Sequence, residues 1–229
     1  MKKTTVLLDA GGILLDESEF EDFACETVTR LLRANDSRYS AEDYWADTRE
    51  AVFRFCTSTP RAVFWKRCGA DAARYTVLFT AYKDAMERGR PPIKLYAEME
   101  MEIPALAASF RLVCAGQYSA EVYDLLERHG LAKHFANRLS QDDFAITKPD
   151  PRYVARIAER SGVATEACIM VGDRIDKNVI PGKQNGMGTV FVRTGIYRTQ
   201  EPRMLEEAPD ITLDSLNGLA NAVVLRWGT

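Results

Sequence analysis

Histidine is scarce in this chain, which has only His129 and His134 among its 229 residues. Both flank the end of a predicted helix, so we interpret them as a helix-dipole partner and a surface residue, not as a metal pair. The cysteines number five, are widely spaced, and form no Cys-x-x-Cys motif. This pattern argues against a disulfide framework and fits reduced thiols packed as small apolar side chains in a cytoplasmic protein.

The chain also lacks a long apolar run and an excess of positive charge. The apolar stretch after Met1-Lys2-Lys3 is far too short for a signal peptide or a membrane span. The net charge of −3 and the pI near 5.6 argue against a surface for nucleic acid or anionic membranes. We therefore expect a cytoplasmic protein with no nucleic-acid or membrane partner. No feature of the sequence specifies an oligomeric state.

The first third of the chain after the N-terminus is predicted to be helical. Almost no strand signal occurs between Glu17 and Arg90, and apolar residues recur there at helical spacing. The predicted helices run from 19 to 35, from a capping box at Ser40-Ala41-Glu42-Asp43 to about 56, from Pro60 onward, and from 71 to 88. The segment Gly89-Arg90-Pro91-Pro92 ends the last of them.

From residue 92 onward helices and strands alternate. Strands are predicted at 111–115, 168–171, 189–193 and 210–213, with a weaker candidate at 137–140; helices are predicted at 103–110, 119–130, after 151 to 161, and 214–227. This alternation predicts an α/β Rossmann-like core with a parallel sheet covered on both faces. We expect a core domain of residues 1–16 and 92–229, with an α-helical domain of residues 17–91 inserted after the first strand.

The first predicted strand, Val6-Leu7-Leu8, leads directly into Asp9, and Gly11-Gly12 follows. In a parallel α/β sheet the carboxyl ends of the strands form the floor of the ligand crevice, which would place Asp9 on that floor. An aspartate before two glycines is also a common turn former. Its catalytic role therefore depends on partners at the ends of other strands.

Two such partners follow later in the sequence. Asp173 comes directly after the strand 168–171, and Lys148 lies in the loop Thr147-Lys148-Pro149-Asp150-Pro151. Two carboxylates and an ammonium group at the end of one sheet suit a divalent cation and a phosphate group. A carboxylate can also attack phosphorus and form an aspartyl phosphate.

Four segments resemble the motifs of the haloacid dehalogenase-like (HAD) superfamily, most members of which are phosphatases. They are Leu8-Asp9-Ala10-Gly11-Gly12-Ile13-Leu14, Cys114-Ala115-Gly116-Gln117, Thr147-Lys148-Pro149-Asp150-Pro151 and Val171-Gly172-Asp173-Arg174-Ile175-Asp176-Lys177-Asn178. The segment from Val179 to Met187 also resembles the helix and turn that follow in many members. The resemblance spans nearly the whole chain and implies that residues 17–91 form a helical cap.

The resemblance also implies a role for each site residue. Asp9 would be the nucleophile, and Lys148 would bind the phosphate group together with the strand end at Ala115 and Gly116. A Mg²⁺ cofactor would be held by Asp9, Asp173 and the backbone carbonyl of Gly11, with Asp176 and Asn178 as supporting metal residues. The substrate would be a small phosphorylated molecule.

Three positions depart from the family pattern. Gly11 occupies the position of the aspartate that protonates the leaving group in the phosphatases, and such acid–base groups contribute roughly 10²–10⁴-fold in rate. Ala115 replaces a serine or threonine whose hydroxyl would hold a phosphate oxygen. Asn178 replaces the last acidic residue of the fourth motif.

Three functions are compatible with this combination. The first is a Mg²⁺-dependent phosphatase with weakened acid–base machinery, or with a proton supplied by the cap or the substrate. The second is a non-catalytic HAD fold that binds a phosphorylated ligand or a partner protein. The third is a metal-free 2-haloacid dehalogenase, which is disfavoured because Gly172-Asp173 persists here. We favour the first.

Overall fold

The computed structural model describes residues 2–34, 36–118 and 121–228. Its strands are β1 (Thr5–Leu8), β2 (Leu15–Asp16), β3 (Lys94–Leu95), β4 (Arg111–Cys114), β5 (Cys168–Gly172), β6 (Gly188–Val192) and β7 (Ile211–Leu213). Its α-helices are α1 (Ser18–Arg33), α2 (Ala41–Phe53), α3 (Thr59–Arg67), α4 (Ala72–Gly89), α5 (Met99–Ala107), α6 (Glu121–Arg128), α7 (Arg152–Arg160), α8 (Ile180–Gln184) and α9 (Leu219–Trp227). A π-helical turn covers Ile175–Val179.

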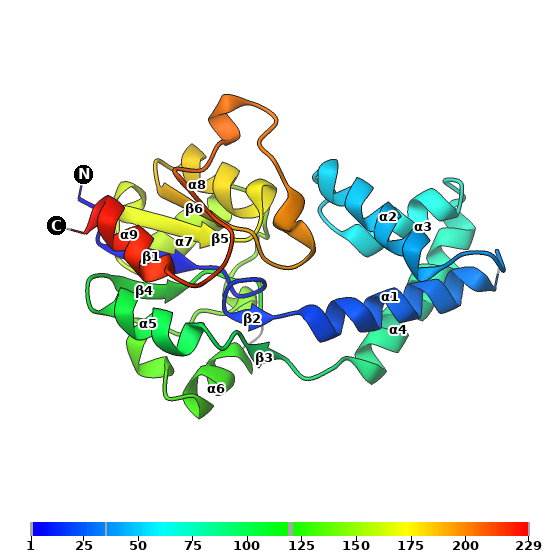
Figure 1. The fold of residues 1–229 in the computed structure, drawn as a ribbon, viewed down its shortest axis with the longest axis horizontal. Coiled ribbons are helices and arrows are strands. Elements are labelled where there is room, and N and C mark those ends of the chain that lie inside the picture. Colours follow the sequence, from blue (N-terminus) through cyan, green and yellow to red (C-terminus); the bar gives the residue numbers. More distant parts are fainter. Residues whose placement is uncertain (1, 35, 119–120, 229) are drawn as a thin grey trace. The chain divides into compact units, whose positions relative to one another are not determined.

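The chain forms two compact units, one of residues 1–16 and 94–229 and one of residues 17–93. The expected boundary at residue 91 lies two residues before the observed one. The first unit contains the five-stranded sheet, and the second contains α1 to α4 (Figure 1).

All neighbouring strands of the five-stranded sheet are parallel, in the order β4-β1-β5-β6-β7. Leu8 at the end of β1 is in register with Cys114 on one side and Val171 on the other. The residues that follow these three strand ends therefore emerge at one edge of the sheet. The predicted α/β Rossmann-like fold is confirmed.

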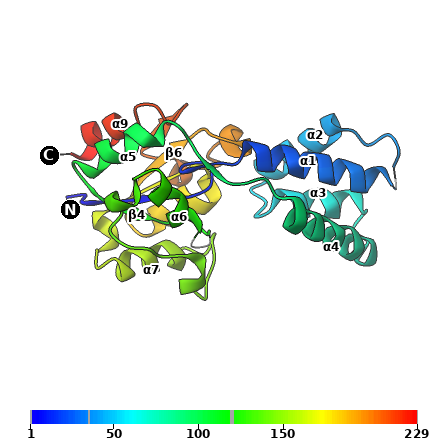
Figure 2. The same cartoon turned by 90° about the horizontal axis from the view of Figure 1, so that it is seen from below.

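Helices cover both faces of the sheet. α5 and α9 lie on one face and α7 on the other (Figure 2). On the α7 side, Tyr153, Val154 and Ile157 pack against Leu7 and Met170 in one buried cluster. The hydrophobic residues of β1 and β5 are fully buried, as expected for strands covered on both sides.

The helical unit has its own apolar core, which includes Val28, Phe64 and Tyr82. The predicted capping box starts α2: the Ser40 hydroxyl accepts the Asp43 N–H at 3.2 Å, and the Asp43 carboxylate accepts the Ser40 N–H at 2.9 Å. The predicted start of the fourth helix is also confirmed, because the Asp71 carboxylate caps α4 by accepting two backbone N–H groups. Rings of Phe64, Phe79 and Tyr82 contact one another within this core.

Some sequence predictions need correction or extension. Residues 137–140 form no strand; instead Phe135 makes a single bridge to Leu112. The predicted helix 119–130 is observed as α6, and its residues 119 and 120 lie outside the described part, as does residue 35 of the first predicted helix. No helix within the described ranges has the length and apolar character needed to cross a membrane.

Candidate active site

Asp9 lies at the carboxyl end of β1 and is held there by the backbone. Its N–H donates to the carbonyl of Val171 at 2.9 Å, which continues the pairing of β1 with β5. Its Oδ1 accepts the N–H of Ala10 at 2.8 Å. The residue is only 8% exposed. The carboxylate is therefore nearly buried and its orientation is defined by its own loop.

Two donors from distant parts of the chain reach the other oxygen of Asp9. Lys148 Nζ lies 2.8 Å from Asp9 Oδ2, and Asn178 Nδ2 donates to the same oxygen at 2.5 Å. The structure thus brings together Asp9 and Lys148, as the sequence predicted. The Lys148 ammonium is buried. Apart from its ion pair with Asp9, it has no hydrogen-bond partner among the described residues.

A buried ammonium with unused N–H groups is costly unless a further acceptor completes its shell. An anionic ligand placed beside Asp9 would supply that acceptor. This is the feature of the site that points most directly to a phosphate group.

Gly12 brings the loop after β1 against Asp173 at the end of β5. Gly12 has φ of +70°, a conformation that favours glycine. A Cβ at this position would lie 2.4 Å from Asp173 Oδ2, so a side chain there would displace the carboxylate. The Thr194 hydroxyl donates to the Gly12 carbonyl at 2.5 Å and fixes the same loop. Gly12 and Asp173 are thereby held close together, and Asp173 is 4% exposed.

Asp176 is placed differently from its expected role in supporting a metal. Arg174 donates to both of its oxygens, at 3.0 and 2.6 Å, and Gln200 Nε2 donates to its Oδ1 at 3.0 Å. Both partners of the ion pair are buried, and the Arg174 guanidinium lies 3.9 Å from the ring centroid of Tyr197. The Asp176 carboxylate is therefore occupied by a structural network, and the expectation that it supports a metal does not fit this geometry.

Asn178 also differs from that expectation. Its amide nitrogen donates to Asp9, and its amide oxygen accepts the backbone N–H of Arg174 at 3.1 Å. It packs against Gly172, where a Cβ would lie 2.2 Å from Asn178 Cγ. With both ends of the amide engaged, Asn178 positions the Asp9 carboxylate.

Ala115 and Gly116 continue β4 beside Asp9. The Ala115 N–H donates to Leu8 O at 2.7 Å, and its methyl group is buried in the core. The Gly116 carbonyl accepts the Tyr153 hydroxyl at 3.0 Å. The Ala115 side chain therefore offers no polar contact to a phosphate group. Only the backbone of this strand end remains for that predicted role.

The predicted metal ligands are hard oxygen donors at two adjacent strand ends, which suits Mg²⁺. Within the described part of the chain, no group of three or more His, Cys, Asp or Glu side chains is arranged to hold a metal ion. The predicted set has only two carboxylates, Asp9 and Asp173, and completes its shell with the Gly11 carbonyl.

Sequence reasoning missed Lys177, which lies in the π-helical turn after Asp173. Burial, and to a lesser degree the Arg174 cation, lower the pKa of Lys177 from 10.5 to about 8. The charges of Asp9 and Lys148 also act on this ammonium, so it lies within the electrostatic field of the site. A lysine next to a motif aspartate reads as a surface residue in the sequence, and no pattern distinguishes it.

We expect Lys177→Met to stabilise the protein at pH 7.5 by on the order of 1–3 kcal/mol. Between about pH 8 and 10.5 the unfolded chain keeps the proton that the folded chain has released. Stability of the wild type should therefore rise relative to the variant across this window, and the difference should shrink toward pH 10.5. Urea unfolding of both proteins at several pH values measures this difference in the free energy of unfolding. The exposed Lys133→Met is the control, and a pH-independent difference for Lys177→Met would contradict the assignment.

Comparison with known proteins identifies the family. A model of haloacid dehalogenase-like hydrolases matches residues 3–186. The chain belongs to this family. The resemblance inferred from the four motifs is therefore confirmed, and the protein is a HAD-like hydrolase.

This HAD-like hydrolase has curated relatives named as phosphatases. Glyceraldehyde 3-phosphate phosphatase of Methanopyrus kandleri is 26% identical over 224 residues, which cover 95% of this chain and 96% of the relative. Phosphoglycolate phosphatase of Agrobacterium fabrum is 32% identical over 111 residues, covering 48% of this chain and 46% of the relative.

A solved structure described as a HAD hydrolase, YfnB of Bacillus subtilis, has the same fold. Its TM-score is 0.64 at 19% identity, and the match covers 97% of this chain and 99% of that one.

Proposed function

We propose that this hydrolase is a Mg²⁺-dependent phosphatase that cleaves a small phosphorylated metabolite through an aspartyl phosphate on Asp9. The observation that carries the proposal is the buried pair of Asp9 and Lys148, 2.8 Å apart at the end of β1. The pair combines a carboxylate nucleophile with a cation whose hydrogen-bonding capacity is unused by the described residues. The phosphatase names of the relatives support the same reaction class.

The reaction proceeds in two displacements. An Asp9 carboxylate oxygen forms a bond to phosphorus, and the bond from phosphorus to the leaving oxygen breaks. The leaving group departs as an alkoxide or aryl oxide and takes its proton from water, since Gly11 has no acidic side chain. Water then attacks phosphorus, releases inorganic phosphate and restores the Asp9 carboxylate.

Asn178 contributes to these two reaction steps by positioning the Asp9 carboxylate, and Lys148 contributes by its positive charge. Asn178 holds the carboxylate by its hydrogen bond to Oδ2. The Lys148 ammonium offsets the negative charge of the phosphoryl group as it approaches the carboxylate. Asp9, Asp173 and the Gly11 carbonyl would hold Mg²⁺. When bound, Mg²⁺ supplies further positive charge to the phosphoryl oxygens. The structural relative from Bacillus subtilis is described as bound to magnesium, which supports this choice of metal.

Millimolar Mg²⁺ is expected to raise the unfolding temperature, because an ion that binds only the folded state stabilises it by mass action. For about 1–2 kcal/mol of binding stabilisation, the shift would be about 2–8 °C in a chain of this size. Differential scanning fluorimetry with and without Mg²⁺ measures it. The shift should vanish in Asp173→Asn and persist in the exposed control Asp124→Asn. A wild-type protein that does not respond to Mg²⁺ would favour a metal-free reaction or a metal-free binding role.

The names of the relatives indicate the size and chemical class of the substrate. A relative that matches over nearly its whole length and one that matches over about half of it are named for glyceraldehyde 3-phosphate, and further relatives matched over about half their length are named for phosphoglycolate. Both are phosphate esters of two- or three-carbon alcohols. We therefore propose a small phosphate monoester as the substrate of this chain.

We further propose that the helical unit of residues 17–93 acts as a cap that selects the substrate. If it does, its connections to the core should change when a ligand occupies the site. Phosphate with Mg²⁺ is expected to slow hydrogen exchange in residues 14–20, measured by mass spectrometry. The peptide covering β7 serves as the internal control. Exchange that is unchanged at saturating ligand would mean that the unit does not gate the site.

A further inference from the structure

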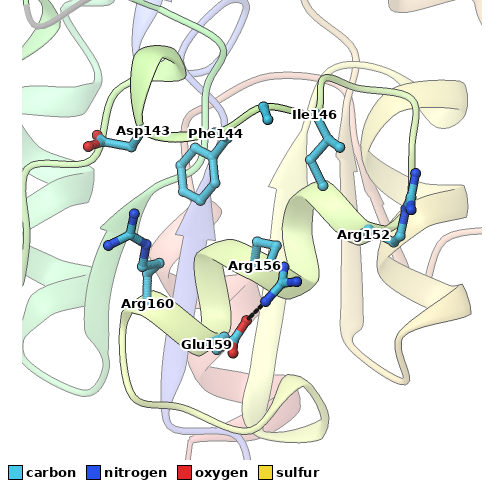
Figure 3. Close-up of a pocket in the computed structure, with 8 residues that line it drawn as sticks. Asp143, Phe144, Ile146, Arg152, Arg156, Glu159 and Arg160 are labelled. Atoms are coloured by element: carbon cyan, nitrogen blue, oxygen red, sulfur yellow. Dashed lines mark hydrogen bonds and ion pairs between the residues drawn. The ribbon is translucent and has the colours of Figure 1, made fainter.

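A cavity of about 430 Å³ lies where the loop 143–146 meets the exposed side of α7. Phe144 and Ile146 extend from the loop toward the helix, and Arg156, Glu159 and Arg160 extend from the helix (Figure 3). None of these residues contributes to the Asp9 site. The volume falls in the range of about 300–1,000 Å³ that is usual for small-molecule sites.

The wall contributed by α7 is basic. Arg152, Arg156 and Arg160 line the cavity at spacings of four residues, which places them on one side of the helix. Arg152 pairs with Asp150 at 2.6 Å, and Arg156 pairs with Glu159 at 2.6 Å. The Arg160 side chain makes no hydrogen bond or ion pair with any residue that the structure describes.

The guanidinium groups of Arg156 and Arg160 are available to a ligand. The Arg156–Glu159 pair is exposed, with 60% and 64% of the two side chains accessible. Exposed pairs of this kind are worth about 0–1 kcal/mol, so a stronger acceptor can replace Glu159 at little cost. A guanidinium presents paired N–H groups that match a carboxylate or phosphate group.

The loop side of the cavity is apolar and supported by the core. Phe144 and Ile146 are partly buried and pack against the cluster between α7 and the sheet. The Phe144 ring meets the Tyr153 ring edge to face, with centroids 5.2 Å apart. Tyr153 is itself fixed by its hydroxyl bond to the Gly116 carbonyl at 3.0 Å. The apolar surface of the cavity is therefore already formed without a ligand.

The acidic residues of the lining limit the charge of the ligand. Asp143 accepts the Ser140 N–H at 2.7 Å and so completes its own turn. With Glu159 it balances two of the three arginines, which leaves one net positive charge on the lining. One net positive charge matches a ligand with a single anionic group and does not balance the several charges of a polyphosphate.

We propose that this cavity is a second ligand site, which binds a small organic anion consisting of an apolar or aromatic body and one carboxylate or phosphate group. The anionic group is held by Arg156 and Arg160, and the apolar body packs on Phe144 and Ile146. The site is independent of the phosphatase reaction at Asp9.

The test uses phenylacetate as the probe and backbone amide chemical shifts of the full chain as the readout. Binding at the Asp9 site is recognised separately, by shifts at residues 9–12 and 173–178. Saturable shifts are expected at residues 144–146 and 152–160, with a dissociation constant of about 1 mM. The neutral isostere phenylacetamide should bind at least about 10-fold more weakly, because it lacks the charge that the arginines recognise.

Variants separate this site from general anion binding. The double variant Arg156→Ala with Arg160→Ala should weaken phenylacetate binding by at least about 10-fold. Both arginines are exposed, so the remaining spectrum should stay unchanged and report an intact fold. Arg128→Ala, an exposed arginine on α6, is the matched control and should bind as the wild type does. The proposal is overturned if these residues show no shifts, if phenylacetamide binds equally well, or if the double variant binds with unchanged affinity.

Discussion

Asp9→Asn is expected to lower kcat for p-nitrophenyl phosphate by at least about 10³-fold, because an amide cannot replace the carboxylate that attacks phosphorus. The substitution keeps the size of the side chain and its contact with Asn178. It removes the negative charge beside the buried Lys148 ammonium, 2.8 Å away. Breaking a buried ion pair destabilises a protein by about 3–5 kcal/mol, so lost activity could also reflect a lost fold.

A second variant separates these two causes. Asp9→Glu keeps the charge beside Lys148 but displaces the carboxylate by one methylene, and it should be folded and inactive. Asp124→Asn, an exposed aspartate on α6, should keep wild-type turnover. Steady-state kinetics and circular dichroism on the same samples provide the comparison. Turnover retained by a folded Asp9→Asn protein would exclude Asp9 as the nucleophile. A wild-type protein with no turnover of any phosphate ester would favour the non-catalytic alternative.

The enzyme is expected to cleave aryl and acyl phosphates about 10²–10⁴-fold faster than alkyl phosphates, because no acid beside Asp9 protonates the leaving oxygen. An aryl oxide or a carboxylate leaves readily as an anion, whereas an alkoxide needs a proton. Comparing kcat/KM for p-nitrophenyl phosphate, acetyl phosphate and glycerol phosphate measures the margin. Equal rates for aryl and alkyl esters would mean that another group supplies the proton.

Restoring the acid tests the same explanation in the opposite direction. Gly11→Asp should raise alkyl-ester turnover most, and Gly11→Asn, which has the same size without the acid, should not. The position in this loop that disfavours a side chain is Gly12, which has φ of +70° and whose added Cβ would clash with Asp173. Gly11 is absent from the positive-φ glycines of the described chain, so its backbone accepts a side chain more readily. An unchanged substrate preference in Gly11→Asp would contradict the role assigned to this position.

The positions of Asp9 and Asp173 at adjacent strand ends could be predicted because they depend on topology. Apolar runs mark the strands, parallel strands end at one edge, and polar residues that follow them must meet there. The capping box of α2 is likewise a local pattern with one geometric outcome. In each case the signal lies within a few residues of the feature that it predicts.

The sequence did not predict the contacts of Asp176, because several possible hydrogen-bond partners lie within its reach and the local pattern does not distinguish them. Asp176 follows Asp173 by three positions, yet a π-helical turn directs it to Arg174 and Gln200. Gln200 lies far along the chain, in a loop that no periodicity identifies. The predicted strand at 137–140 failed for a related reason. A short stretch with few apolar residues does not by itself compete for a place in the sheet.

The short antiparallel pairing of β2 and β3 has a consequence for how this chain can change. Leu15 pairs with Leu95 and Asp16 with Lys94, so the chain leaves the core and returns to it at adjacent positions. Every strand of the five-stranded sheet lies outside the intervening segment. That segment is therefore a replaceable insertion. We expect the hydrogen bonds of the five-stranded sheet to be kept when the segment is replaced by a tight turn or by the equivalent segment of a relative. Recombination at two sites in the gene can therefore exchange the helical unit while preserving every strand of the five-stranded sheet.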